Sequence, residues 1–263
     1  MFRFWLHFPP LLVLLGLGLV FAVSAVLTYW LLCRSRWSKA FDSRIPTAAF
    51  PVAIAVIFAL FTGFLLANMV DQKNRAVRIV RDEGQALSLL QIGSETAKTT
   101  GPSIRAAVDA YARSVLAADW DAMRRETSAP ESSARLLDLL RLVQSDAVAN
   151  DVKPAMYAHM LSLTKTVADS RQSRISIVSN HVWQFAWSGL FILGFLTQFS
   201  IGLVHQDKPR AVGLALALYT TAVVVSLWLI AVQDNPFRSE IWQVSPKPIQ
   251  AVVRPRPSAS VSF

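Results

Sequence analysis

The sequence predicts an all-α membrane protein with four transmembrane helices. Hydrophobic residues make up 53% of the 263-residue chain and charged residues only 16%, whereas a soluble domain averages about 25% charged residues. Charged side chains are absent from four windows of 22 or 23 residues, at 11–32, 47–69, 182–204 and 211–232. About 20 helical residues cross the ~30 Å hydrocarbon core of a bilayer, and a helix pairs its backbone polar groups internally. Each window therefore predicts a membrane-spanning helix.

The first window has a signal peptide as its alternative interpretation, because Ser24 and Ala25 are small enough for a cleavage site. The apolar run continues beyond Ala25 to Leu32. It is therefore longer than the ~7–15 residues of a typical signal-peptide core. We interpret 11–32 as a retained transmembrane helix.

The order of the windows predicts two membrane hairpins with a helical extramembrane domain between them. The first hairpin occupies 1–69 and the second 182–232, because only short connections join the two windows of each pair. The domain between them, 70–181, carries 15 basic and 13 acidic residues, a composition that suits contact with water. The remaining residues, 233–263, are rich in proline and predict an extended tail, with 254–263 disordered.

Helical periodicity runs through the extramembrane domain, as in the series Ile104, Val108 and Tyr111. The helix of the second window is predicted to continue past the membrane to about residue 91, and another is predicted to run from residue 154 into the third window. Ser128 and Glu131 fit a capping box at the start of a further helix.

The formal net charge of +9 is better explained by the membrane than by nucleic acid. Lys and Arg residues flank the predicted spans, where they contact lipid phosphates. They are Arg34, Arg36, Lys39, Arg44, Lys73, Arg75, Arg78, Arg81, Arg171 and Arg174. We therefore expect the lipid bilayer as a partner and no nucleic acid. The basic residues of loop 33–46 favour an external position for the large domain.

The sequence contains no motif typical of an enzyme. It lacks a phosphate-binding glycine loop, a Gly-x-Ser-x-Gly nucleophile turn and a His-Glu-x-x-His zinc motif. Cys33 is the single cysteine, so an intrachain disulfide is excluded. The acidic pairs Asp82–Glu83 and Asp119–Asp121 are interpreted as solvated helix faces. We expect no enzymatic activity, no catalytic residues, no metal and no cofactor.

Small and polar residues follow one face of each of the last two spans. They recur at every fourth residue, a spacing that lets helices approach closely in lipid. The residues with this expected packing role are Gly194, Gln198, Gly202, Gly213, Ala217 and Thr221. A pore-lining role is the alternative for Gln198.

Large apolar residues recur near helical spacing in the second span. Such a stripe usually packs against another helix or contacts lipid, but a ring of bulky apolar side chains also closes a pore by keeping it dry. The residues that form this possible pore constriction are Ile54, Phe58, Phe61 and Leu65.

Several local patterns together resemble the bestrophin-like family of bacterial membrane proteins. After the last span, Asp234, Pro236 and Phe237 are followed by Pro246 and Pro248, an order similar to the tail motif of the family. Further similar patterns are spread over the chain, at Glu83, Ala86, Leu87, Tyr111, Val115, Asp119, Trp120, Arg171, Arg174 and Trp183. The sequence departs from the family at Asp119, where the family has Glu, and at Ser239, where it usually has Gly.

The resemblance implies a subunit of an oligomeric channel that passes anions passively. It further implies a homo-oligomer, pentameric as in bestrophins, with a pore neck lined by the second span. The implied location is the bacterial inner membrane, with both termini and the large domain on the same, cytoplasmic side. Because the tail offers only Asp234 and Glu240 as acidic residues, we expect no calcium site. The alternative function is a non-conducting membrane protein whose helical domain binds or senses a partner.

Overall fold

The computed structural model describes residues 9–34, 49–179, 183–205, 208–233, 235–238 and 243–253. These residues form helices joined by turns, with no β-strand among them, which confirms the predicted all-α class. The chain divides into two compact units. The apolar unit comprises Met1–Asp71 with His181–Asp234, and the polar unit comprises Gln72–Asn180 with Asn235–Phe263.

The apolar unit holds the four helices of the described chain that are long and apolar enough to cross a membrane. They are α1 (Pro10–Cys33), the first part of α2 (Ala49–Ser94), α8 (Trp183–Val204) and α9 (Pro209–Val232). Both α1 and α9 begin at a proline. Proline is favourable there because the first turn of a helix has no partner for the N–H that proline lacks. For this reason α9 begins two residues before the predicted span.

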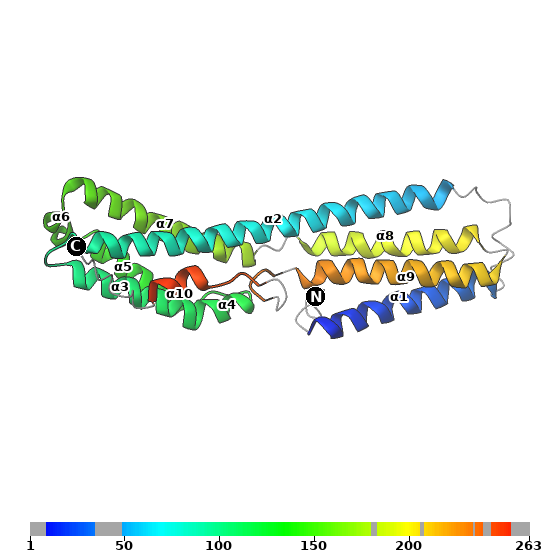
Figure 1. Ribbon diagram of the computed structural model, residues 1–263. Helices are drawn as coiled ribbons and strands as arrows, with labels where there is room; N and C mark the ends of the chain where they lie inside the picture. The colour runs from blue at the N-terminus through cyan, green and yellow to red at the C-terminus, as the bar shows by residue number, and fades with distance from the viewer. Residues whose placement is uncertain are drawn as a thin grey trace, which may run out of the picture. The chain divides into compact units, whose positions relative to one another are not determined.

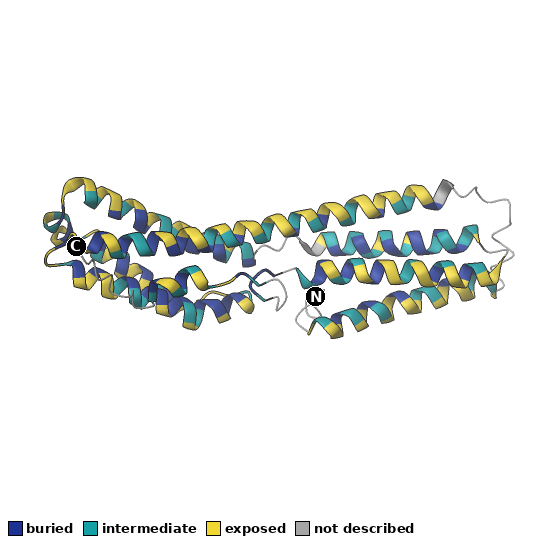
Figure 2. Ribbon diagram, viewed as in Figure 1, coloured by how far each residue is buried: buried dark blue, intermediate teal, exposed yellow. Residues whose placement is uncertain are grey.

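Three helices of the apolar unit pack closely on one another: α1 lies against α9 and α8, and α8 lies against α9 (Figure 1). Phe21, Leu190 and Leu227 are buried between them. The outward faces are exposed in a single chain, as Figure 2 shows, and carry leucine and valine side chains that suit contact with lipid. In contrast, α2 meets α8 and α9 through aromatic side chains: Phe61 lies beside Gly189 of α8, and Phe58 beside Tyr219 of α9.

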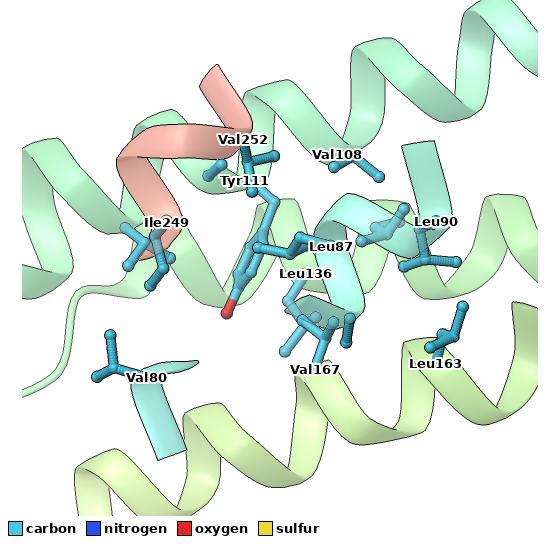
Figure 3. Packing of buried hydrophobic residues seen from close by; sticks show 14 of the residues in the cluster. Val80, Leu87, Leu90, Val108, Tyr111, Leu136, Leu163, Val167, Ile249 and Val252 are labelled. Carbon is cyan, nitrogen blue, oxygen red and sulfur yellow. The ribbon is translucent and has the colours of Figure 1, made fainter. Parts of the chain in front are cut away.

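The polar unit is built from the second part of α2 and a series of shorter helices. These are α3 (Gly101–Ser114), the π-helical turn η3 (Val115–Asp119), α4 (Trp120–Arg124), α5 (Pro130–Val143), α6 (Asp146–Asp151), α7 (Pro154–Ser179) and α10 (Lys247–Val253). Their apolar faces meet in one core, in which Leu87, Val108 and Val167 are fully buried (Figure 3). The helical periodicity of the sequence therefore marks the buried face.

The predicted extension of the second apolar helix is present, because α2 runs without a break to Ser94. The second predicted continuation is not described throughout. The helix that begins at Pro154 ends at Ser179 and α8 begins at Trp183, and residues 180–182 between them lie outside the described residues. The pairing of α1 with α2 in a hairpin likewise depends on residues 35–48, which are not described.

The prediction of an extended tail was wrong for Lys247–Val253, which form the helix α10. The carbonyl of Pro246 accepts hydrogen bonds from the backbone N–H groups of Ile249 and Gln250. Pro246 and Pro248 therefore precede and begin a helix rather than prevent one, since a proline in the first turn interrupts no hydrogen bond. The segment 254–263, predicted to be disordered, lies outside the described residues.

Candidate functional site

A buried ion pair joins α2 to α7 in the polar unit. The guanidinium of Arg174 donates from Nε to Oε2 of Glu83 at 2.6 Å and from Nη2 to Oε1 at 2.9 Å. Both side chains are fully buried. Two parallel N–H···O bonds of this kind are among the strongest contacts that side chains make. Glu83 and Arg174 therefore fix α2 and α7 relative to each other.

Tyr111 on α3 completes this pair by donating its hydroxyl hydrogen to Oε1 of Glu83 at 2.6 Å. Burial, and then the negative charge of Glu83, raise the pKa of Tyr111 well above its ordinary value of 10.0. The hydroxyl thus remains protonated and acts as a donor. For Arg174, burial alone would lower the pKa, but Glu83, Tyr111 and Asp119 reverse this effect and raise it. The arginine therefore remains charged.

A second buried pair lies beside the first. Arg171 donates from Nε to Oδ2 of Asp119 at 3.0 Å and from Nη2 to Oδ1 at 3.1 Å. The two pairs are linked, because Nη2 of Arg174 lies 3.7 Å from Oδ2 of Asp119. We call Glu83, Tyr111, Asp119, Arg171 and Arg174 the ionic cluster. Its two carboxylates balance its two guanidinium groups, so the cluster is neutral as a whole.

The π-helical turn Val115–Asp119 places Asp119 in this cluster. A π-helical turn contains an extra residue per turn and often lies at a functional site. Oδ1 of Asp119 also accepts the backbone N–H of Ala129 at 3.0 Å. The predicted capping box was wrong, because α5 begins after Ala129 and no side chain caps it. Instead, Asp119 binds the residue that precedes the helix.

The segment that follows α9 in the chain also reaches the ionic cluster. Asn235 donates from Nδ2 to the carbonyl of Met123 at 3.3 Å, and its Oδ1 accepts the backbone N–H of Phe237 at 2.9 Å. The same Met123 accepts a hydrogen bond at its sulfur from Nη1 of Arg174, at 3.3 Å. The ring of Phe237 meets Trp120 edge to face, with 5.5 Å between ring centres. The tail therefore forms part of the core of the polar unit.

Further along the tail, Pro248 lies directly on α2. A Cβ atom added to Gly84 would come within 2.7 Å of the backbone carbon and oxygen of Pro248. Only glycine permits this approach. Gln91 adds a hydrogen bond from Nε2 to the carbonyl of Val252 at 3.2 Å. Of the tail residues on which the resemblance rests, Pro236, Phe237, Pro246 and Pro248 belong to the polar unit, and Asp234 lies outside the described residues.

The interpretation of Glu83 and Asp119 as solvated residues was wrong. Each has an acidic neighbour that is exposed, Asp82 and Asp121, but Glu83 and Asp119 themselves are fully buried. The sequence does indicate that Glu83 is buried, because this residue lies three and four residues from apolar positions of α2 and so shares their helix face. The ionic cluster contains no unpaired acid or base for catalysis. Its contacts instead join α2, α3, η3 and α7.

The predicted constriction residues of α2 lie toward the other helices of the same chain. Phe58 and Leu65 are buried, and Ile54 and Phe61 are half-buried. The ring of Phe58 lies 6.5 Å from that of Tyr219, between ring centres. The role of these four residues in a pore stays a prediction.

The opposite face of α2 is apolar and, among the described residues, largely exposed. Its large side chains are Val56, Leu60 and Phe64, spaced four residues apart and 50%, 68% and 67% exposed. With Ala59 and Gly63 they line a shallow apolar hollow. We call this set the outer face of α2. The sequence pattern does not distinguish this face from the inner one, because both faces of the span are uncharged.

The packing stripe predicted on α8 lies against α1. A Cβ atom on Gly194 would come within 3.0 Å of the Phe21 ring, and one on Gly202 within 2.7 Å of Leu32. Gln198 donates from Nε2 to the carbonyl of Phe21 at 3.1 Å and to Oγ1 of Thr220 at 2.9 Å. These contacts bring α1, α8 and α9 together.

The packing stripe predicted on α9 lies differently. Gly213, Ala217 and Thr221 are exposed, and a Cβ atom added to Gly213 would meet nothing within 4 Å. Within a single chain this stripe therefore faces outward. Its predicted packing role would require another molecule.

Four long apolar helices with a helical polar unit define a multi-pass integral membrane protein. The family model of the bestrophin-like domain matches residues 8–249. The chain therefore belongs to the bestrophin-like domain family. No curated protein matches it.

Two crystal structures are similar to this chain, and each match covers 91% of this chain and 96% of the other at a TM-score of 0.69. One is of a membrane protein, at 11% sequence identity. The other is of a bacterial bestrophin homolog from Klebsiella pneumoniae that carries a point mutation, at 10% identity. At these identities the likeness concerns the fold.

Proposed function

We propose that the protein is a subunit of a homo-oligomeric, passive anion channel. The observation that carries this proposal is the outer face of α2, which is uncharged, apolar and uncovered in a single chain. Copies arranged around a common axis would bring these faces together. Membership of the bestrophin-like family supports an oligomeric channel, and we propose five subunits by analogy with bestrophins.

The outer face of α2 has the properties of a hydrophobic gate. A ring of Leu60 and Phe64 side chains offers water no hydrogen bonds, so a narrow passage between them stays dry until it widens. Phe58 and Leu65 already fill space within the chain. We therefore propose Val56, Leu60 and Phe64 as the constriction, with Ile54, Phe58, Phe61 and Leu65 as the alternative.

Anion selectivity is supported by the charge on the part of α2 that follows its apolar stretch. Arg78 and Arg81 are exposed there, and exposed arginines raise the local concentration of anions. The described parts of the four apolar helices carry no charged residue between Pro10 and Cys33, Pro51 and Val70, Phe185 and Val204, or Ala211 and Val232. A proton-coupled pump would place ionisable groups there, so passive passage is the better interpretation.

The proposal is tested by anion flux in liposomes that contain the purified protein. We predict that Leu60→Ala and Phe64→Ala increase the flux, because a smaller side chain widens and wets the constriction. Leu218→Ala is the matched control. Leu218 is 65% exposed on α9, close to the exposure of Leu60, but it is not part of the outer face of α2, so its loss should leave the flux unchanged.

Each outcome of this test has a clear interpretation. A wild-type protein without flux, or one that is monomeric in detergent, would contradict the channel. It would favour the alternative, a non-conducting membrane protein whose helical domain binds or senses a partner. If Phe58→Ala and Phe61→Ala raise the flux while Leu60→Ala and Phe64→Ala do not, the inward-facing residues form the constriction instead.

We further propose that the four spans form two membrane hairpins in the inner membrane of a bacterium. The polar unit and both termini then lie on one side, which we propose to be the cytoplasm. In a Cys33→Ser background, Lys98→Cys in the polar unit and Lys208→Cys beside α9 should react with a membrane-impermeant maleimide from opposite sides. Both original side chains are exposed. Labelling of the two positions from the same side would contradict the four-span topology.

A further inference from the structure

The way in which α2 is held in the apolar unit differs from that of its neighbours. Side-chain hydrogen bonds connect α1, α8 and α9, as in the contact of Gln198 with Thr220. On α2, by contrast, Thr62 donates to the carbonyl of Phe58 and Asn68 to that of Phe64, both within α2 itself. The contacts of α2 with α8 and α9 include the apolar rings of Phe58 and Phe61.

Two aromatic rings of α2 lie over glycines of α8. A Cβ atom added to Gly189 would lie 3.2 Å from Cε1 of Phe61, and one added to Gly194 would lie 3.7 Å from Cε2 of Phe58. The first distance is tighter than ordinary van der Waals contact. The ring of Phe61 thus occupies the space that the absent side chain of Gly189 leaves on the surface of α8.

We propose that the contact of Phe61 with Gly189 sets the distance between α2 and α8, and thereby the width of the pore. This inference rests on the proposed channel function. Because a helix is stiff, a displacement of its inner face moves its outer face as well. A larger side chain at residue 189 would push Phe61, and with it Leu60 and Phe64 on the outer face, away from the chain's own bundle and toward the axis. Gly189 and Phe61 are in this sense positioning residues.

The test is a double-mutant cycle measured by anion flux. Gly189→Val should lower the flux several-fold, because the displaced α2 narrows the constriction. Adding Phe61→Ala to Gly189→Val should restore most of the flux, since the removal of the ring frees the space that the valine occupies. Gly16→Val is the matched control. Gly16 lies on α1, and a Cβ atom there would meet nothing within 4 Å, so the same change should leave the flux unaltered.

The cycle separates this inference from its alternatives. If Phe61 lined the pore, Phe61→Ala would raise the flux by the same factor with glycine or valine at residue 189. Such additivity, which is typical of independent sites, would overturn the proposal. Gly189→Ala serves as a milder variant if the valine variant does not fold, and it should show the same rescue.

The flux measurements also distinguish a failure of the channel proposal from a failure of this inference. A wild-type protein without flux would overturn both proposals. Flux that responds to Leu60→Ala but not to any change at residue 189 would overturn this inference alone.

Discussion

Replacing Arg174 with leucine is expected to unfold the polar unit. The substitution leaves the carboxylate of Glu83 without its cationic partner in a site that water does not reach. Breaking a buried ion pair on one side costs about 3–5 kcal/mol, a large part of the 5–15 kcal/mol that typically stabilises a folded domain. The measurement is thermal unfolding in detergent, followed by circular dichroism and tryptophan fluorescence.

Arg135→Leu provides the control for this experiment, because Arg135 is exposed in the same unit. Surface substitutions of this kind usually change stability by no more than ~0.5 kcal/mol. The double variant Glu83→Leu/Arg174→Leu should be more stable than Arg174→Leu alone, since it removes the unpaired charge. An Arg174→Leu protein as stable as the control would show that the ionic cluster does not hold the unit together.

Replacing Gly84 with alanine is expected to dislodge the tail from α2. Alanine normally stabilises the interior of a helix by about 0.5–1 kcal/mol relative to glycine. Here its methyl group would come within 2.7 Å of the backbone of Pro248. Backbone atoms cannot rotate away as a side chain does, so we expect a net loss of ~1–3 kcal/mol, as in other overpacked cores. Release of the tail should also expose Lys247–Val253 to limited proteolysis.

Gly93→Ala is the matched control, because Gly93 is also a buried glycine of α2. A Cβ atom there would lie 3.5 Å from the side chain of Met160, at an ordinary contact distance. This variant should be as stable as the wild type or more stable. Equal behaviour of the two alanine variants would mean that the tail does not press against Gly84 in the protein.

The fold class could be predicted from the sequence because lipid imposes a simple requirement. A window without charge and long enough to cross the bilayer has few structural alternatives to a helix. Helical periodicity also identified the buried face of the polar unit, as the burial of Ile104, Val108 and Tyr111 shows. Both signals are local, which is why a single sequence contains them.

The ionic cluster could be predicted only in part. Glu83 directly follows the exposed Asp82, and Asp119 lies two residues before the exposed Asp121. Charged residues are rarely buried without partners. Their partners lie far along the chain: Arg174 is 91 residues from Glu83, and Arg171 is 52 residues from Asp119. Residue types alone do not reveal such a pairing. The patterns shared with the bestrophin-like family include these residues, but they do not indicate which residues contact one another.

The inner and outer faces of α2 could not be distinguished from the sequence. In water, the buried side of a helix is apolar and the exposed side is polar, so periodicity separates them. In lipid both sides are apolar, and the pattern of Phe58 and Leu65 does not differ in kind from that of Leu60 and Phe64. Only the packing of α2 against α8 and α9 distinguishes the inner face from the outer one.

The composition of the polar unit has a consequence for how the protein is made. Its parts come from both sides of α8 and α9 in the chain, since Asn235–Phe263 are translated after the last apolar helix. At a synthesis rate of ~5–20 residues per second, Arg174 is added to the chain on the order of 10 s after Glu83. Asn235, Phe237 and Pro248 arrive later still. The core of the polar unit can therefore be completed only after all four apolar helices have been synthesised. A fully folded polar unit is thus expected only in chains whose translation has passed the last span.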